Sequence, residues 1–151
     1  MQQLPKYSEL PALEGARVLV VEDEAILAME LESILREAGA QAVTLCRTVE
    51  GALAALAKNG VAAAVLDVRV GREPVGPVAG QLARRGSPFR FYTGQIGNDP
   101  ALEQWPRCRV ITKPAPAKVI VSAVRDLLRN SRLQVVGGPQ SLGARHYSRC
   151  R

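Results

Sequence analysis

The stretch Val61-Ala62-Ala63-Ala64-Val65-Leu66-Asp67 decides the fold of this 151-residue chain. Six apolar residues in a row end on a carboxylate. An uninterrupted apolar run of this length is typical of a strand that is buried on both faces of a parallel sheet. Strands of this kind present ligand-binding groups at their carboxyl ends, in the crevice above the sheet. Asp67 is therefore either a helix cap or a functional group, and the rest of the chain decides between the two.

Four further strands alternate with helices on both sides of this stretch. The predicted strands are residues 17–21, 42–45, 61–66, 89–93 and 109–112. Helices are expected between Glu24 and Gly39, from Thr48 to Gly60, over 75–85 and after Pro116, whereas at most one short helix fits near 101–105. This alternation requires right-handed crossovers and predicts an α/β fold. We expect a doubly wound five-stranded parallel sheet with the flavodoxin-like order 2-1-3-4-5 and a reduced fourth helix.

The chain reads as one domain with an extra segment at each end. Residues 1–15 lack hydrophobic periodicity and are expected to form a flexible lead-in, residues 16–129 form the domain, and residues 130–151 are expected to be a disordered basic tail. The net charge is +6, and the tail holds four arginines and no acidic residue. The excess charge is thus not the dense stripe across a folded body that binds nucleic acid, so nucleic acid is not an expected partner.

Several classes of protein are disfavoured by composition. No run of about 18 uncharged apolar residues exists, so no membrane span is predicted. The start, Met1-Gln2-Gln3-Leu4-Pro5-Lys6, lacks the basic cluster and apolar region of a secretory signal, and we expect a cytoplasmic protein. Cys46, Cys108 and Cys150 show neither Cys-x-x-Cys spacing nor a nearby histidine, so no zinc site is predicted.

Polar side chains stand at the ends of four predicted strands: Glu22-Asp23, Asp67, Thr93 and Lys113. In the order 2-1-3-4-5 the first and third strands are neighbours, which brings the three carboxylates close together. Two carboxylates about 4 Å apart repel by about 4 kcal/mol at an effective dielectric constant near 20. A hard divalent cation with oxygen ligands, of which Mg²⁺ is the obvious choice, relieves that repulsion. With Lys113 on the far side, the pocket suits a phosphoryl group held against Asp67.

Each of these signals also has a purely structural explanation. Acidic residues before a helix are ordinary caps or first-turn residues, and Asp67 could cap the following helix. Thr93 before a glycine is an ordinary strand-end hydroxyl, and Lys-Pro is common after a strand. Their joint occurrence on the appropriate strands is what favours one pocket over independent accidents.

With these residues assembled, positions 16–129 resemble the receiver domain of two-component response regulators. The resemblance rests on the Glu22-Asp23 pair, Asp67, Thr93 and Lys113-Pro114. It implies that Asp67 accepts a phosphoryl group from a histidine kinase. Thr93 would then hydrogen-bond the phosphoryl group, Lys113 would pair with one of its oxygens, and the Lys113-Pro114 peptide bond would be cis.

The resemblance also implies a set of magnesium ligands. Asp23 and Asp67 would hold Mg²⁺ directly, Glu22 would act through water, and the backbone carbonyl of Arg69 would be a further ligand. The Arg69 side chain either reaches over the phosphoryl site or is an exposed loop arginine.

A narrower likeness lies in the run Pro88-Phe89-Arg90-Phe91-Tyr92-Thr93-Gly94. It looks like a stand-alone receiver subfamily marked by Phe-Ala-Thr-Gly, with Tyr92 in place of the alanine. That subfamily has a reduced fourth helix and works with histidine kinases of the HWE/HisKA2 type. Val110 stands where receivers usually carry an aromatic switch residue, and Tyr92 is either its substitute or a plain strand aromatic.

The resulting prediction is a single-domain response regulator that signals by protein–protein contact, as a phosphate shuttle, sink or switch. It would be a regulatory phosphoacceptor that catalyses only its own phosphorylation and dephosphorylation, and it could form a homodimer. A haloacid-dehalogenase-like phosphohydrolase would need a second aspartate two residues after Asp67, where Arg69 stands. A nucleotide- or flavin-binding module would need a glycine-rich first turn. Two alternative functions stay open. One is a receiver-like interaction module that is not phosphorylated, and the other is a nucleic-acid binder that uses the arginine tail.

Overall fold

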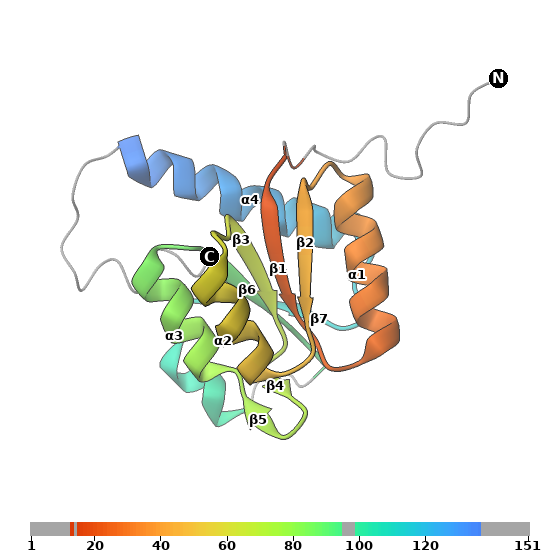
Figure 1. Cartoon of the computed structure of the whole chain (residues 1–151), viewed down its shortest axis with the longest axis vertical. Helices are drawn as coiled ribbons and strands as arrows, with labels where there is room; N and C mark the ends of the chain where they lie inside the picture. Colours follow the sequence, from red (N-terminus) through yellow and green to blue (C-terminus); the bar gives the residue numbers. More distant parts are fainter. Residues whose placement is uncertain (1–12, 14, 95–98, 137–151) are drawn as a thin grey trace.

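The computed structural model describes residues 13, 15–94 and 99–136, and its central feature is a five-stranded parallel sheet. Its strands are β1 (Arg17–Val21), β2 (Ala42–Cys46), β3 (Ala63–Leu66), β6 (Phe89–Thr93) and β7 (Val110–Thr112). They lie side by side in the order β2-β1-β3-β6-β7 (Figure 1). This is the predicted order 2-1-3-4-5, so the doubly wound α/β fold is confirmed.

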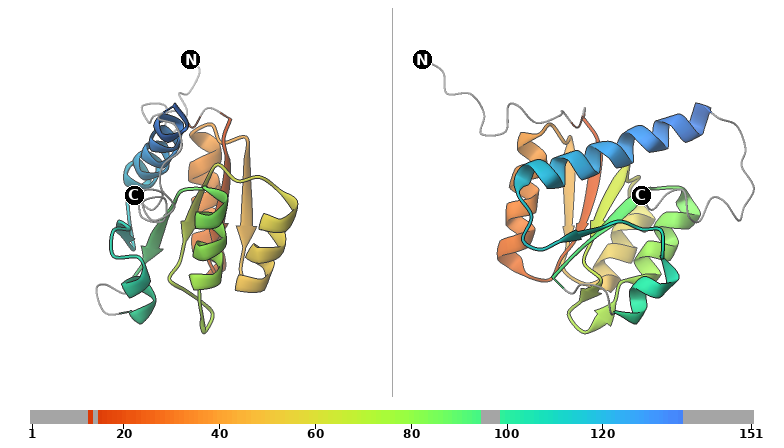
Figure 2. Two further views of the ribbon diagram at one scale, coloured as in Figure 1. Left: turned by 90° about the vertical axis from the view of Figure 1, so that its left-hand side faces the viewer. Right: turned by 180° about the vertical axis from the view of Figure 1, so that it is seen from behind.

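Four α-helices cover the two faces of the sheet (Figure 2). They are α1 (Ala25–Glu37), α2 (Val49–Lys58), α3 (Gly76–Arg85) and α4 (Ala117–Val136). Helices α2 and α3 share one hydrophobic core with the sheet, and α1 and α4 share the other. The apolar stripe of each helix therefore has a sheet face to cover it, which is the reason these amphipathic segments fold as helices.

Strand β3 explains the unbroken apolar run of the sequence. Ala64 and Leu66 belong to the core on the α2/α3 side, whereas Ala63 and Val65 belong to the core on the α1/α4 side, and all four side chains are buried. A central strand with both faces covered cannot alternate apolar and polar residues. The strand begins at Ala63, two residues later than the pattern predicts.

The connection between β6 and β7 is reduced, as predicted. In its described part it contains one short 3₁₀-helix, η1 (Pro100–Gln104), in place of a full helix. Trp105 follows η1 and packs edge-on against Phe89, with 5.3 Å between ring centroids. This contact attaches the connection to the core on the α2/α3 side.

Two local features of the structure lie next to the predicted domain boundaries. Leu13 lies in the segment expected to be flexible, but its side chain is fully buried and its amide donates to the Ala38 carbonyl oxygen at 2.8 Å. Helix α4 runs to Val136, past the boundary expected at residue 129, so the first residues of the supposed tail are helical. Residues 137–151, the remainder of that tail, lie outside the described residues.

A two-stranded hairpin follows Asp67, where the sequence predicts a glycine-containing loop. Strands β4 (Arg69–Val70) and β5 (Glu73–Pro74) pair in antiparallel fashion. Gly71 turns the chain between them with a φ of +67°, a conformation that glycine adopts without steric cost. The hairpin extends beyond the carboxyl ends of the parallel strands (Figure 1).

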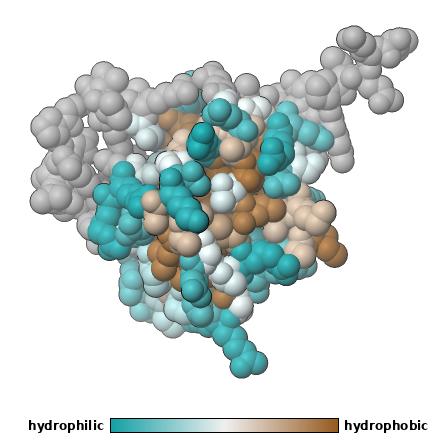
Figure 3. Space-filling model, in the orientation of Figure 1, coloured by the Kyte–Doolittle hydropathy of each residue, from teal (hydrophilic) through white to brown (hydrophobic). Residues whose placement is uncertain are grey.

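The surface of the described part shows mostly polar side chains on the face drawn in Figure 3, with hydrophobic areas between them. Its largest exposed hydrophobic residues include Ile26 and Met29 on α1, with 76% and 67% of their surface exposed. Among the described helices, none combines the length and the apolar character needed to cross a bilayer.

Candidate functional site

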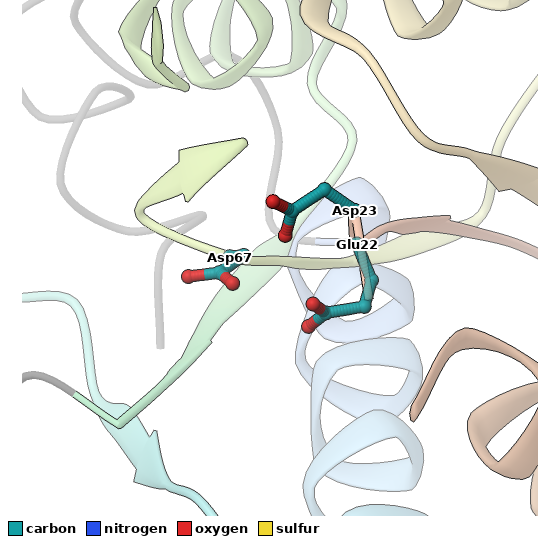
Figure 4. Close-up of side chains that lie close together, drawn as sticks. All are labelled: Glu22, Asp23 and Asp67. Atoms are coloured by element: carbon teal, nitrogen blue, oxygen red, sulfur yellow. The ribbon is translucent and has the colours of Figure 1, made fainter. Parts of the chain in front are cut away.

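The register of β1 and β3 places Glu22 and Asp67 at the same edge of the sheet. Val21 pairs with Leu66, and the Asp67 amide donates to the Val21 carbonyl oxygen at 2.9 Å. The next residue on each strand is therefore an acid, and Asp23 follows directly. Figure 4 shows the three carboxylates converging on one region beyond the strand ends.

The three acids form a cluster that could hold a metal ion. One carboxylate oxygen from each of Glu22, Asp23 and Asp67 lies within 4.8 Å of the other two. Glu22 is buried, with 2% of its surface exposed, and the side chain of Asp67 is 12% exposed. The Gly71 amide in the β4–β5 turn donates to Asp23 Oδ2 at 3.0 Å and holds that carboxylate in place. Three carboxylate oxygens this close together are the kind of ligands that a hard divalent cation such as Mg²⁺ prefers.

Lys113 enters the cluster from the end of β7. The Lys113 ammonium nitrogen lies 2.8 Å from Asp67 Oδ2 and 2.6 Å from Glu22 Oε2. The Lys113-Pro114 peptide bond is cis, as the resemblance implies. The lysine thus bridges acids from two neighbouring strands and places one positive charge beside Asp67.

Burial and charge act in opposite directions on the ionisable groups here. Burial raises the pKa of Glu22, and the hydrogen bonds from Lys113 and the Glu24 amide offset this only in part. Burial by itself would lower the pKa of Lys113, but its bonds to Asp67 and Glu22 outweigh this, and the pKa is raised. Lys113 therefore keeps its charge at neutral pH, and a cation bound among the acids would favour ionised Glu22.

Thr93 ends β6 and is buried, with 3% of its surface exposed. It pairs with Thr112 of β7, and its carbonyl oxygen accepts from the Lys113 amide at 3.0 Å. Thr93 and Lys113 thus lie at the edge that also carries the acids. Val110, at the position of the usual aromatic switch, is 37% exposed on β7.

The Arg69 side chain binds Asp99, a residue that no sequence pattern marks as part of the site. Its Nε and one terminal nitrogen donate to the two oxygens of Asp99 at 2.7 and 3.0 Å. Asp99 Oδ1 also accepts from the Ala101 amide at 2.9 Å and so caps η1. Arg69 therefore neither reaches over Asp67 nor points freely into solvent. The one local signal for Asp99 is an aspartate before Pro100, which is typical of a helix cap.

No protein-family model and no curated protein matches this sequence. Solved structures do match: a response regulator receiver protein from Sinorhizobium medicae WSM419 is 27% identical, with a TM-score of 0.70, and the match covers 80% of this chain and 99% of that one. SdrG from Sphingomonas melonis Fr1 is 34% identical, with a TM-score of 0.60, over 76% of this chain and 96% of that one.

Two further matches extend the comparison. SdrG from Pseudomonas melonis Fr1 in a BeF3-activated conformation is 35% identical, with a TM-score of 0.62, over 77% of this chain and 98% of that one. The response regulator PhyR from Brucella abortus is 18% identical with a TM-score of 0.69, a likeness of fold alone. That match covers 84% of this chain, which spans about half, 53%, of the PhyR chain.

Proposed function

We propose, since this chain belongs to the receiver domains of response regulators, that Asp67 accepts a phosphoryl group from a histidine kinase and that the phosphorylated form signals by protein–protein contact. The observation that carries this proposal is the Lys113 ammonium 2.8 Å from Asp67 Oδ2, inside a cluster of three acids. This arrangement is suited to a dianionic group on Asp67, with positive charge already in place to receive it.

Each residue of the site has its own role in phosphoryl transfer. Asp67 attacks phosphorus in line, the bond from phosphorus to the donor breaks, and its electron pair leaves with the donor. Lys113 balances negative charge on the phosphoryl oxygens, and the Thr93 hydroxyl donates to one of them. Glu22, Asp23, Asp67 and the Arg69 carbonyl would hold Mg²⁺, which when bound supplies further positive charge to those oxygens.

The competing enzyme is a phosphohydrolase with an aspartyl nucleophile. Such an enzyme needs an acid–base carboxylate two residues after the nucleophile, but Arg69 stands there and binds Asp99. A nucleotide-binding module is also disfavoured, because Glu22 and Asp23 present negative charge where a phosphate would bind. We therefore propose a regulatory phosphoacceptor with no further substrate.

The proposed partner is a histidine kinase of the HWE/HisKA2 type, inferred from the Phe89–Gly94 run. We also propose a cytoplasmic regulator that can form a homodimer and whose downstream partner is a protein. In support of a receiver role, the match covers nearly the whole of the receiver protein and SdrG chains. SdrG has a BeF3-activated conformation, and BeF3⁻ has the geometry of a phosphoryl group on a carboxylate.

The test is direct labelling of Asp67. Incubation with acetyl phosphate and Mg²⁺ should give one phosphoryl adduct that is stable in acid and labile in base. Asp67→Asn should abolish it, whereas Asp126→Asn, which removes a half-exposed aspartate on α4, should leave it unchanged. Equal labelling of the wild type and of Asp67→Asn would exclude this function.

A further inference from the structure

Tyr92 is a buried aromatic residue that contacts the segment carrying Lys113. It precedes Thr93 on β6, pairs with Ile111 of β7 and is 3% exposed. Its side chain belongs to the core on the α1/α4 side. The motif that the Phe89–Gly94 run resembles has an alanine here, so the ring is a feature of this chain.

Two contacts connect Tyr92 to the loop after β7. The Lys113 ammonium nitrogen lies 5.5 Å from the centroid of the Tyr92 ring, within the range of a cation–π interaction. The Tyr92 hydroxyl oxygen accepts a hydrogen bond from the Ala115 amide at 3.3 Å. The ring therefore contacts the charged end of Lys113, while the hydroxyl is attached to the backbone two residues further on.

The contacts with Tyr92 matter because the Lys113 side chain has to be held in place. A lysine side chain is long and flexible, and fixing one in place costs about 2 kcal/mol of rotamer entropy. Asp67 and Glu22 attract the ammonium from the acidic side, but both lie in the region where a phosphoryl group and a cation would bind. Tyr92 attracts it as well, and as a buried core residue it is not among the groups that would bind the phosphoryl group or the cation.

We propose that Tyr92 is a positioning residue that keeps the Lys113 ammonium aimed at Asp67, an inference that rests on the proposed phosphoacceptor function. The ring supplies the attraction and the hydroxyl bond to Ala115 fixes the ring relative to the loop. The ammonium then needs little reorganisation when the phosphoryl group arrives, which is the condition for effective charge stabilisation in transfer. Removing the ring should slow phosphorylation through Lys113 and by no other route.

A double-mutant cycle tests this route. Asp67 phosphorylation by acetyl phosphate is measured for the wild type, Tyr92→Leu, Tyr92→Phe, Lys113→Met and the Tyr92→Leu/Lys113→Met pair. We expect Tyr92→Leu to slow the rate about 2- to 30-fold, the range that one cation–π contact supports, and Tyr92→Phe to restore most of it. In the Lys113→Met background, Tyr92→Leu should have no further effect, and an equal slowing in both backgrounds would overturn the proposal.

Phe91→Leu is the control for loss of core packing. Phe91 lies one residue away on β6, is equally buried and belongs to the opposite core. It should lower stability without changing the labelling rate of the folded protein. If Tyr92→Leu fails to fold, Tyr92→Met takes its place in the cycle, because methionine fills irregular core space and offers no ring.

A second measurement does not depend on phosphorylation. The ε-methylene NMR signals of Lys113, assigned by their loss in Lys113→Met, should show a ring-current shift in the wild type and Tyr92→Phe but not in Tyr92→Leu. An unchanged signal in Tyr92→Leu would refute the Tyr92 contact even if Asp67 is labelled. A wild type that cannot be labelled at Asp67, but shows the shift, would instead refute the phosphoacceptor function.

Discussion

Glu22 is the most buried of the three acids in this site. Its carboxylate is almost wholly buried, and the ion contact with Lys113 at 2.6 Å offsets the cost of that burial only in part, since its pKa stays raised. Acids with a pKa raised by burial cluster at binding sites, because a bound cation repays the cost of keeping them charged. Its placement beside Asp23 and Asp67 is consistent with a ligand to a cation.

Thr93 and Val110 allow a test of the switch at the scale of single residues. Thr93 is buried at the strand end beside Lys113, whereas Val110 is partly exposed on β7. If the hydroxyl contacts the phosphoryl group, Thr93→Ala should reduce the phosphorylation response by about 10- to 160-fold, since a hydrogen bond to a charged group contributes about 1.5–3 kcal/mol. Val110→Ala should change it less than twofold. The response is measured as the extent of amide chemical-shift change on adding BeF3⁻ and Mg²⁺, and a larger effect at Val110 would contradict the prediction.

At the scale of elements, the Arg69–Asp99 pair connects the β4–β5 hairpin to η1. The two hydrogen bonds are parallel, and the Asp99 side chain is 2% exposed, whereas that of Arg69 is 41% exposed. The hairpin follows Asp67 and η1 follows Thr93, so the pair joins the segments that leave two of the site's strands. A bidentate arginine–carboxylate pair sets geometry as well as energy, and here it fixes the Arg69 side chain relative to η1.

Breaking this pair should destabilise the protein. Asp99→Asn removes one charge from a buried pair and should cost about 1–3 kcal/mol in the free energy of unfolding, at the lower end because Arg69 is partly exposed. Urea denaturation in buffer with a chelator measures this, and Glu103→Gln, at an exposed acid of η1, is the matched control.

The Arg69–Asp99 pair should also make the stability of the protein depend on pH. Burial by itself would raise the pKa of Asp99, but the Ala101 amide and the Arg69 guanidinium together hold it below its ordinary value of 3.8. A lowered pKa contributes stability that is present above that ordinary value and is lost as the pH falls through the folded-state value. The stability difference between the wild type and Asp99→Asn should therefore shrink below about pH 4. A difference that stays constant down to pH 2 would refute this assignment.

At the scale of the whole molecule, one sheet separates two hydrophobic cores and carries the polar residues of the candidate site at one edge. The parallel strands all end on the side that carries Glu22, Asp67, Thr93 and Lys113. Because the cores lie on opposite faces, the edge can bind charged ligands without exposing apolar side chains. Binding at that edge should stabilise the fold as a unit.

Adding Mg²⁺ should therefore raise the melting temperature. At a free Mg²⁺ concentration of 100 times Kd, linkage predicts about 2.7 kcal/mol of added stability, and BeF3⁻ should raise it further. Asp23→Asn should lose most of the increase, whereas Asp126→Asn should keep it, as measured by differential scanning calorimetry. An equal increase in Asp23→Asn would place the cation elsewhere.

The sequence by itself determined the sheet, its order and the acids, threonine and lysine at its edge. Strands β1 and β6 begin and end where the pattern predicts, because an apolar run and its bounding residues are local properties of the chain. The three acids were predictable as neighbours since the order of parallel strands follows from alternation of elements.

Only the tertiary structure decided the contacts between side chains distant in sequence. Arg69 could have faced Asp67 or solvent, and its partner Asp99 lies thirty positions away, where no periodicity connects them. The hairpin after Asp67, the burial of Leu13 and the Tyr92 ring beside Lys113 likewise depend on which surfaces meet in three dimensions. Such pairings are set by packing of the whole fold, and the local pattern of residues does not encode them.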